Sequence, residues 1–79
     1  MRIDKFLKIS RLIKRRTLAN EACDTGRVKL NDKVVKAGAE VQEGDIIEIR
    51  FGSSVTRVKI ETVSEHATIQ ASKEMYTIL

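Results

Sequence analysis

The stretch SRLIKRRTLANEACDTGRVKLND, Ser10 to Asp32, joins a basic connection, a segment of small residues, a glycine and a short alternating run. Four positive charges fall within six residues of it, at Arg11, Lys14, Arg15 and Arg16. No acidic residue lies within four positions of the last three, whereas a surface built only for solubility usually mixes both signs. The pattern favours a surface that binds phosphates over one that is merely solvated.

The middle of this stretch predicts a helix from Thr17 to Thr25. Its first residue is a good N-cap, and Gly26 is the natural residue just beyond the C-terminus. Arg15 and Arg16 then stand immediately before the helix, where free backbone N–H groups and the helix dipole already favour an anion. We expect Arg16 to make the most important phosphate contact.

The segment RVKLND at the end of the stretch alternates between polar and apolar residues. Val28 and Leu30 point one way and Arg27 and Lys29 the other, which is the period of a half-buried strand. Asn31-Asp32 is a turn dipeptide. Basic side chains are therefore expected on the exposed face of a short strand.

Upstream, Ile3, Phe6 and Leu7 have the spacing of the buried stripe of a helix, which predicts a first helix from about Asp4 to Ser10. Asp4 is expected to cap it, or else to orient a neighbouring arginine toward RNA. Phe6 is expected in the core rather than as a stacking platform. The segment RLIKRR, Arg11 to Arg16, is then a connection.

Downstream, apolar and β-branched runs separated by turn residues predict several strands. These lie at Lys33–Lys36, Ile46–Phe51, Val55–Ile60, Ala67–Ala71 and Met75–Leu79. A bulge or change of face is expected in the third, because Val55 and Val58 are out of phase. The fold class is α+β, with short N-terminal helices packed on a small, mainly antiparallel sheet.

Length and charge limit the function. A chain of 79 residues is expected to form a single domain, residues 1–79, with a small core. Residues 1–36 hold eleven basic and four acidic residues, whereas residues 37–79 hold four basic and seven acidic ones. This asymmetry is the footprint expected of a protein that binds nucleic acid or an anionic membrane.

Catalytic and metal-binding patterns are missing from the sequence. His66 and Cys23 are each the sole residue of their type and lie far apart, so no zinc site is credible. Glu61 and Glu65 have the spacing of neighbours on a helix, but their segment has the pattern of a strand that passes into a turn. A catalytic pair of carboxylates is therefore not expected there. We therefore expect a protein that is not an enzyme and that takes no cofactor or metal.

The N-terminus alternates charged and apolar residues and holds neither a signal peptide nor a membrane span. Together with the single cysteine, this predicts a cytoplasmic protein in a reducing compartment.

The segments RIDKFL, SRLIKRRTLANEACDTGRVKLND and VVKAGAEVQEGDIIEI together resemble the RNA-binding domain named after ribosomal small-subunit protein S-four, also called the αL motif. The resemblance covers about residues 1–50 and leaves the C-terminal strands, 51–79, outside the motif. Within the family, the chain looks most like the heat-shock protein fifteen subgroup and, more closely, like small members that act in bacterial ribosome-associated quality control.

That resemblance implies binding, as a monomer, to a large ribosomal subunit that still carries a stalled peptidyl-tRNA. It implies contacts with ribosomal RNA and with the tRNA, and support for the addition of alanine tails to the nascent chain. The RNA-binding positions carried over from the family are Arg2, Asp4, Lys5, Arg11, Lys14, Arg15, Arg16, Thr17, Arg27, Lys29 and Asn31. Many family members have Asn-Gly where this chain has Asn31-Asp32, and an acidic residue there weakens the case for a phosphate at the turn.

Three alternatives stay open at this point. The chain could be a general rRNA-binding or ribosome-recycling heat-shock factor, or a DNA-binding protein that inserts the Thr17 helix into a major groove. It could also be a protein adaptor that uses its acidic C-terminal half. The RNA hypothesis requires that the basic groups of both helices and of the first strand converge on one side of the molecule.

Overall fold

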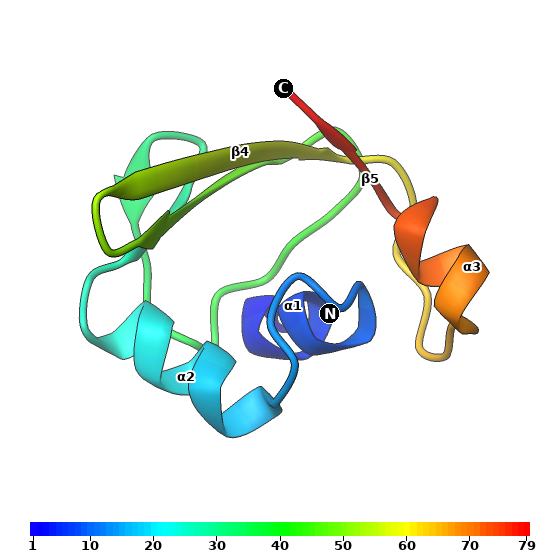
Figure 1. The fold of residues 1–79 in the computed structure, drawn as a ribbon, viewed down its shortest axis with the longest axis horizontal. Coiled ribbons are helices and arrows are strands. Elements are labelled where there is room, and N and C mark those ends of the chain that lie inside the picture. Colours follow the sequence, from blue (N-terminus) through cyan, green and yellow to red (C-terminus); the bar gives the residue numbers. More distant parts are fainter.

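The computed structural model describes residues 1–79 and contains three helices and five strands in two layers (Figure 1). The elements are α1 Ile3–Ile9, α2 Arg16–Asp24, β1 Val28–Leu30, β2 Lys33–Val34, β3 Ile46–Phe51, β4 Ser54–Ile60, α3 Ile69–Lys73 and β5 Tyr76–Ile78. Helices α1 and α2 cover one face of the sheet, and α3 lies beside its β5 end. No helix is long and apolar enough to cross a bilayer.

The sheet has the strand order β2-β1-β3-β4-β5, and every neighbouring pair is antiparallel. The predicted α+β class is confirmed. Strands β3 and β4 pair without interruption from Ile46 opposite Lys59 to Phe51 opposite Ser54, so the expected bulge in this segment is wrong. Val55 simply belongs to the outer face of the sheet, and Val58 belongs to the inner face.

The core lies between the helices and the inner face of the sheet. Phe6 and its neighbours in the predicted stripe are fully buried, which confirms that Phe6 packs in the interior. Each large aliphatic or aromatic side chain buried here contributes about 1.5–3 kcal/mol relative to exposure. The two helices and the sheet all contribute to this core. Their buried residues are Ile3, Phe6 and Leu7 from α1, Ala19, Ala22 and Cys23 from α2, and Val28, Ile47, Ile49, Val58 and Ile60 from the sheet.

Both predicted N-caps are wrong by two residues. The N-cap of α1 is Arg2, which leaves Asp4 inside the first turn, and the N-cap of α2 is Arg15, which leaves Thr17 inside the helix. Neither cap residue makes a side-chain capping bond. Asp4 therefore does not cap α1. Its carboxylate lies between α1 and α2 instead. The end of α2 is as predicted, since Gly26 follows it with φ +80°.

The segment expected as a strand at Ala67–Ala71 is wrong, because it begins the helix α3. The hydroxyl of Thr68 accepts a hydrogen bond from the backbone N–H of Ala71 at 3.1 Å, which caps that helix. Ser72 is the buried residue of this short helix. The β-branched residues Thr68 and Ile69 favoured a strand in the sequence, and a helix of five residues is too short to show a clear period.

Candidate nucleic-acid interface

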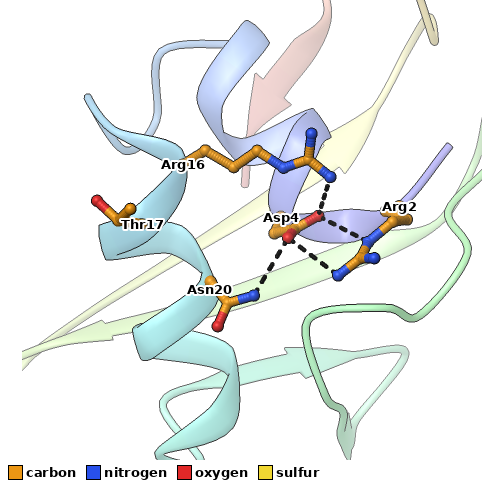
Figure 2. A pocket seen from close by; sticks show the side chains of 5 residues that line it. All are labelled: Arg2, Asp4, Arg16, Thr17 and Asn20. Carbon is orange, nitrogen blue, oxygen red and sulfur yellow. Dashed lines mark hydrogen bonds and ion pairs between the residues drawn. The ribbon is translucent and has the colours of Figure 1, made fainter.

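The candidate site is an open hollow of about 450 Å³ where the beginnings of α1 and α2 meet. We call it the helical site. Its lining is entirely polar and consists of Arg2, Asp4, Arg16, Thr17 and Asn20. Figure 2 shows Arg2, Arg16 and Asn20 directed at the carboxylate of Asp4, while the side chain of Thr17 points away from it.

The start of α1 is fixed by the segment that precedes β3. The backbone N–H of Ile3 donates to the carbonyl of Ala39 at 2.7 Å, and the N-terminal ammonium group forms an ion pair with Glu40 at 2.8 Å. The backbone of Arg2 forms a β-bridge with Glu40. Arg2 and Asp4 are therefore placed by contacts with residues far along the chain.

Asp4 is the centre of the helical site, and its side chain is only 2% exposed. Arg2 donates to it through Nε at 3.2 Å and Nη2 at 3.3 Å. Arg16 donates through Nη2 and Asn20 through Nδ2, both at 3.4 Å. The backbone N–H of Lys5 adds a further bond of 2.8 Å. A buried carboxylate requires such partners, because burying an unpaired charge is costly.

The surroundings of Asp4 keep it ionised. Burial by itself raises the pKa of Asp4, but the hydrogen bonds from Asn20 and Arg16 and the charges of Arg16 and Arg2 outweigh that effect. Its pKa is therefore held below the ordinary value of 3.8. Asp4 is a permanent anion at neutral pH and orients the two arginines.

The two arginines keep free capacity for an external anion. One carboxylate faces two guanidinium groups, so the cluster keeps a net positive charge. The side chains of Arg2 and Arg16 are 49% and 48% exposed, and Arg16 uses one nitrogen for Asp4. A guanidinium presents five N–H donors in a rigid fork that matches phosphate oxygens. The arrangement can therefore hold a phosphate with two oriented donors.

Asn20 is a member of the helical site that sequence reasoning missed. It stands four residues after Arg16 on α2, so both side chains lie on the same face of that helix. This spacing is visible in the sequence. Asn20 carries no charge, so the pattern of basic residues does not identify it.

Four further residues predicted to bind RNA do not line the helical site: Lys5, Arg11, Lys14 and Arg15. Lys14 and Arg15 are exposed on the connection before α2 and have no carboxylate within ion-pair distance. Lys5 is paired with Glu65. Arg11, with φ 63°, lines a separate hollow of about 170 Å³ together with Lys8 and His66. Lys14 and Arg15 are thus the unpaired cations nearest in sequence to Arg16.

The strand residues do not join the helical site, so the expected convergence on one side is wrong. The condition set for the RNA hypothesis holds for Arg2 and Arg16 at the beginnings of the two helices, but not for the first strand. Lys29 is on the outer face of the sheet, which points away from the helices, and its ammonium group lies 3.7 Å from Glu48. Arg27 lies just after α2, where its Nε donates to Thr25 at 3.0 Å. Alternation in β1 requires Lys29 to point away from the core whenever Val28 points into it.

Asn31 has a structural role in the turn between β1 and β2. Asn31 and Asp32 have φ values of 50° and 69°, which confirms the predicted two-residue turn. The Asn31 side chain accepts from the backbone N–H of Ile46 at 2.9 Å and donates to Asp45 at 3.2 Å. Its amide therefore ties the hairpin to the beginning of β3.

Known proteins resemble this chain over the region that holds the helical site. A family model described as "S4 domain" matches residues 1–47. The chain is 50% identical over 78 residues to the RQC P-site tRNA stabilizing factor of Halalkalibacterium halodurans, covering 99% of this chain and 89% of the relative. It is 49% identical to the protein of that name from Listeria innocua, covering all of this chain and 86% of the relative.

A solved structure with a similar fold is that of heat shock protein 15 from Vibrio cholerae, described as trimeric. It superposes with a TM-score of 0.92 at 28% identity and covers all of this chain and 81% of the other. The resemblance found in the sequence is thereby confirmed, both for the domain and for its two subgroups.

Proposed function

The chain belongs to the S4 domain family, and from that membership we propose that it is an RNA-binding factor of ribosome-associated quality control. In this proposal it binds a stalled large ribosomal subunit, contacts large-subunit rRNA and peptidyl-tRNA, and holds the tRNA in the P site. The name of the relatives that match along nearly the whole chain supports the tRNA part of the proposal. The further step, support for alanine tailing of the nascent chain, rests on the same resemblance.

The observation that carries the proposal is the geometry around Asp4. Two half-exposed guanidinium groups are held by one buried carboxylate, so their orientation is set before RNA arrives. A preorganised donor pair loses little side-chain entropy on binding. Proteins hold A-form RNA largely by shape and by contacts to phosphates and 2′-hydroxyls, which is the chemistry that such a pair can supply.

We further propose that residues 1–79 act as one RNA-binding domain. One cluster of 15 buried residues supports this, because it joins α1 and α2 of the motif to Val58, Ile60 and Met75 of the C-terminal part. In the same proposal, Lys14 and Arg15 extend the phosphate contacts of the helical site.

A second candidate is a heat-shock factor that binds ribosomal RNA without acting on tRNA. The close superposition on heat shock protein 15 favours it. The two candidates differ in whether P-site tRNA strengthens binding to the large subunit, and the experiment below separates them.

The test uses the double variant R2Q/R16Q and purified large subunits, with and without peptidyl-tRNA in the P site. A hydrogen bond to a charged group contributes about 1.5–3 kcal/mol. Loss of both arginines, about 3–6 kcal/mol in total, should therefore weaken the affinity for the subunit by roughly 100-fold or more. The matched control is K33Q/K73Q, which removes two exposed cations from β2 and α3 and should bind like the wild type.

Circular dichroism of both variants checks that the fold is intact. If R2Q/R16Q binds as well as the control, the helical site is not the RNA site. Equal affinity for subunits with and without tRNA would favour the heat-shock candidate, and duplex DNA that competes as well as structured RNA would favour a DNA-binding protein.

A further inference from the structure

The outer face of the sheet carries a second group of cations. These residues come from both the basic first half and the acidic second half of the chain. Residues that lie opposite one another on β1, β3 and β4 share a face of the sheet, and successive rows alternate between the inner and the outer face. One row runs from Lys29 through Glu48 to Arg57. Arg50 and Lys59 lie on the same face in the flanking rows. We call these five residues the outer sheet face.

The charges of the outer sheet face are only partly neutralised. Glu48 is its one carboxylate and stands between Lys29 at 3.7 Å and Arg57 at 3.8 Å, both longer than a hydrogen bond. Arg57 also lies 3.9 Å from Asp32 of the hairpin turn. Arg50 and Lys59 are exposed and have no carboxylate within ion-pair distance.

The location of this face is opposite to that of the helical site. The helices cover the inner face of the sheet (Figure 1), where Ile47, Ile49 and Val58 are fully buried. The residues that alternate with these along the strands therefore point away from α1 and α2. The molecule measures only 28 × 24 × 22 Å. Two phosphate backbones on its opposite sides would therefore be held a short distance apart.

We propose that the outer sheet face binds the phosphate backbone of the second of the two RNAs named in the proposed function. The inference rests on the proposed function, since it assumes that the helical site binds the first one. A protein that binds two RNA elements at once stabilises their relative position. Either RNA can leave only after the charge contacts of its own face of the protein are broken.

The chemistry of the face favours RNA over an acidic protein. The centre of a protein interface is poor in charged residues and rich in aromatic ones, whereas nucleic-acid interfaces are polar and strongly positive. The centre here is the charged row of Lys29, Glu48 and Arg57. No aromatic side chain shares the register of this face, so it offers no platform for stacking single-stranded bases. The exposed side chains of Val34 and Val55 also lie on this face, opposite Lys29 and Arg50, and flank the charged centre. The charged row at the centre favours backbone phosphates as the partner.

The experiment measures bridging directly. One short RNA hairpin is fixed to beads and saturated with protein, and capture of a second, labelled hairpin is measured after washing. Wild-type protein should capture the label. The variant R50Q/K59Q should stay on the beads and lose capture to background, because it keeps the helical site. E48Q, which removes the one negative charge of the face, should increase capture.

The control K33Q/K73Q removes the same number of charges elsewhere and should bridge like the wild type. Capture by R50Q/K59Q at the wild-type level overturns the inference and leaves the proposed function intact. By contrast, R2Q/R16Q that still occupies the beads normally would overturn the helical site itself. Displacement of the second hairpin by polyglutamate, with no displacement by polyphosphate, would overturn the inference and assign the face to an acidic protein.

Discussion

At the scale of single residues, Asp4 has the largest effect on the helical site although it does not offer a positive charge. Its buried carboxylate receives hydrogen bonds from both helices and fixes the direction of two guanidinium groups. An acidic residue at a proposed phosphate site is expected to repel the phosphate. Here it acts as a positioning residue, and Arg2 and Arg16 offer more charge than it removes.

The substitution Asp4→Asn should destabilise the protein by about 1–3 kcal/mol at pH 7, since the charged acceptor of several donors is lost. The pKa of Asp4 lies below 3.8 in the folded protein. Its contribution is therefore complete above that pH and is lost as pH falls through the folded pKa. The difference between wild type and D4N, measured by urea unfolding, should shrink toward pH 2.

Glu21→Gln is the control, because Glu21 is exposed on α2 and its side chain makes no hydrogen bond or ion pair. It should change unfolding little at either pH. A stability difference for D4N that is the same at pH 7 and pH 2 would contradict the ionised state assigned to Asp4.

At the residue scale Cys23 has a packing role. Burial first, and then the charges of Asp4 and Asp24, raise the pKa of its thiol to about 11. The thiol is therefore protonated at neutral pH and fills the space beneath α2 as a small apolar group.

At the scale of elements, the β1–β2 hairpin shows how local rules fix structure. Two consecutive residues with positive φ form the turn, and the first of them is anchored by its side chain to the start of β3. Asn is well suited to this position. Asp at the second position is held in a conformation that glycine adopts without cost.

Asp32→Gly should therefore stabilise the protein by up to about 1 kcal/mol, because it removes the cost of a left-handed side-chain residue. For a domain of this size, such a gain raises Tm by about 4–8 °C. Thermal unfolding followed by circular dichroism measures the shift. The loose contact of Asp32 with Arg57 is exposed and contributes little. A lower Tm for D32G would mean that this ion pair outweighs the backbone effect.

Asn31→Gly is the informative contrast, since it also relieves a positive φ but removes the side chain that bonds Ile46 and Asp45. It should lower Tm. Equal gains from both glycines would show that the Asn31 side chain contributes nothing to the hairpin.

At the scale of the whole molecule, charge is organised differently from the way it is organised along the chain. The first 36 residues are basic and the rest are acidic on balance. In the folded protein, Arg50, Arg57 and Lys59 from the acidic half join Lys29 from the basic half on one sheet face. The acidic half therefore does not form one acidic surface, which removes the main argument for a protein adaptor.

Binding of the protein to a single RNA hairpin should depend steeply on salt. Each neutralised phosphate contributes a slope of about 0.7 to 0.9 in log affinity against log salt concentration. R2Q/R16Q should reduce the total slope by about 1.5, as two phosphate contacts are lost. Fluorescence titration over a range of salt concentrations measures both slopes. An affinity that hardly changes with salt would contradict phosphate binding.

The sequence by itself determined the parts of this protein that depend on local spacing. The apolar stripe of Ile3, Phe6 and Leu7 predicted α1, and the turn residues predicted the hairpin after Leu30. The basic run before Thr17 pointed to Arg16, which the structure places in the helical site, and the pattern of residues over about the first 50 positions identified the family. These features repeat within a few residues, so periodicity and turn chemistry suffice to find them.

Only the tertiary structure decided which of these charges act together. The packing of α1 on α2 brings Arg2 and Arg16 to one carboxylate, twelve residues or fewer from it in sequence, and adds Asn20. Strand pairing separates Lys29 from them and places it beside Glu48 and Arg57. The direction of a side chain relative to distant elements is set by helix packing and by sheet register, and neither is encoded in the spacing of residues along one segment.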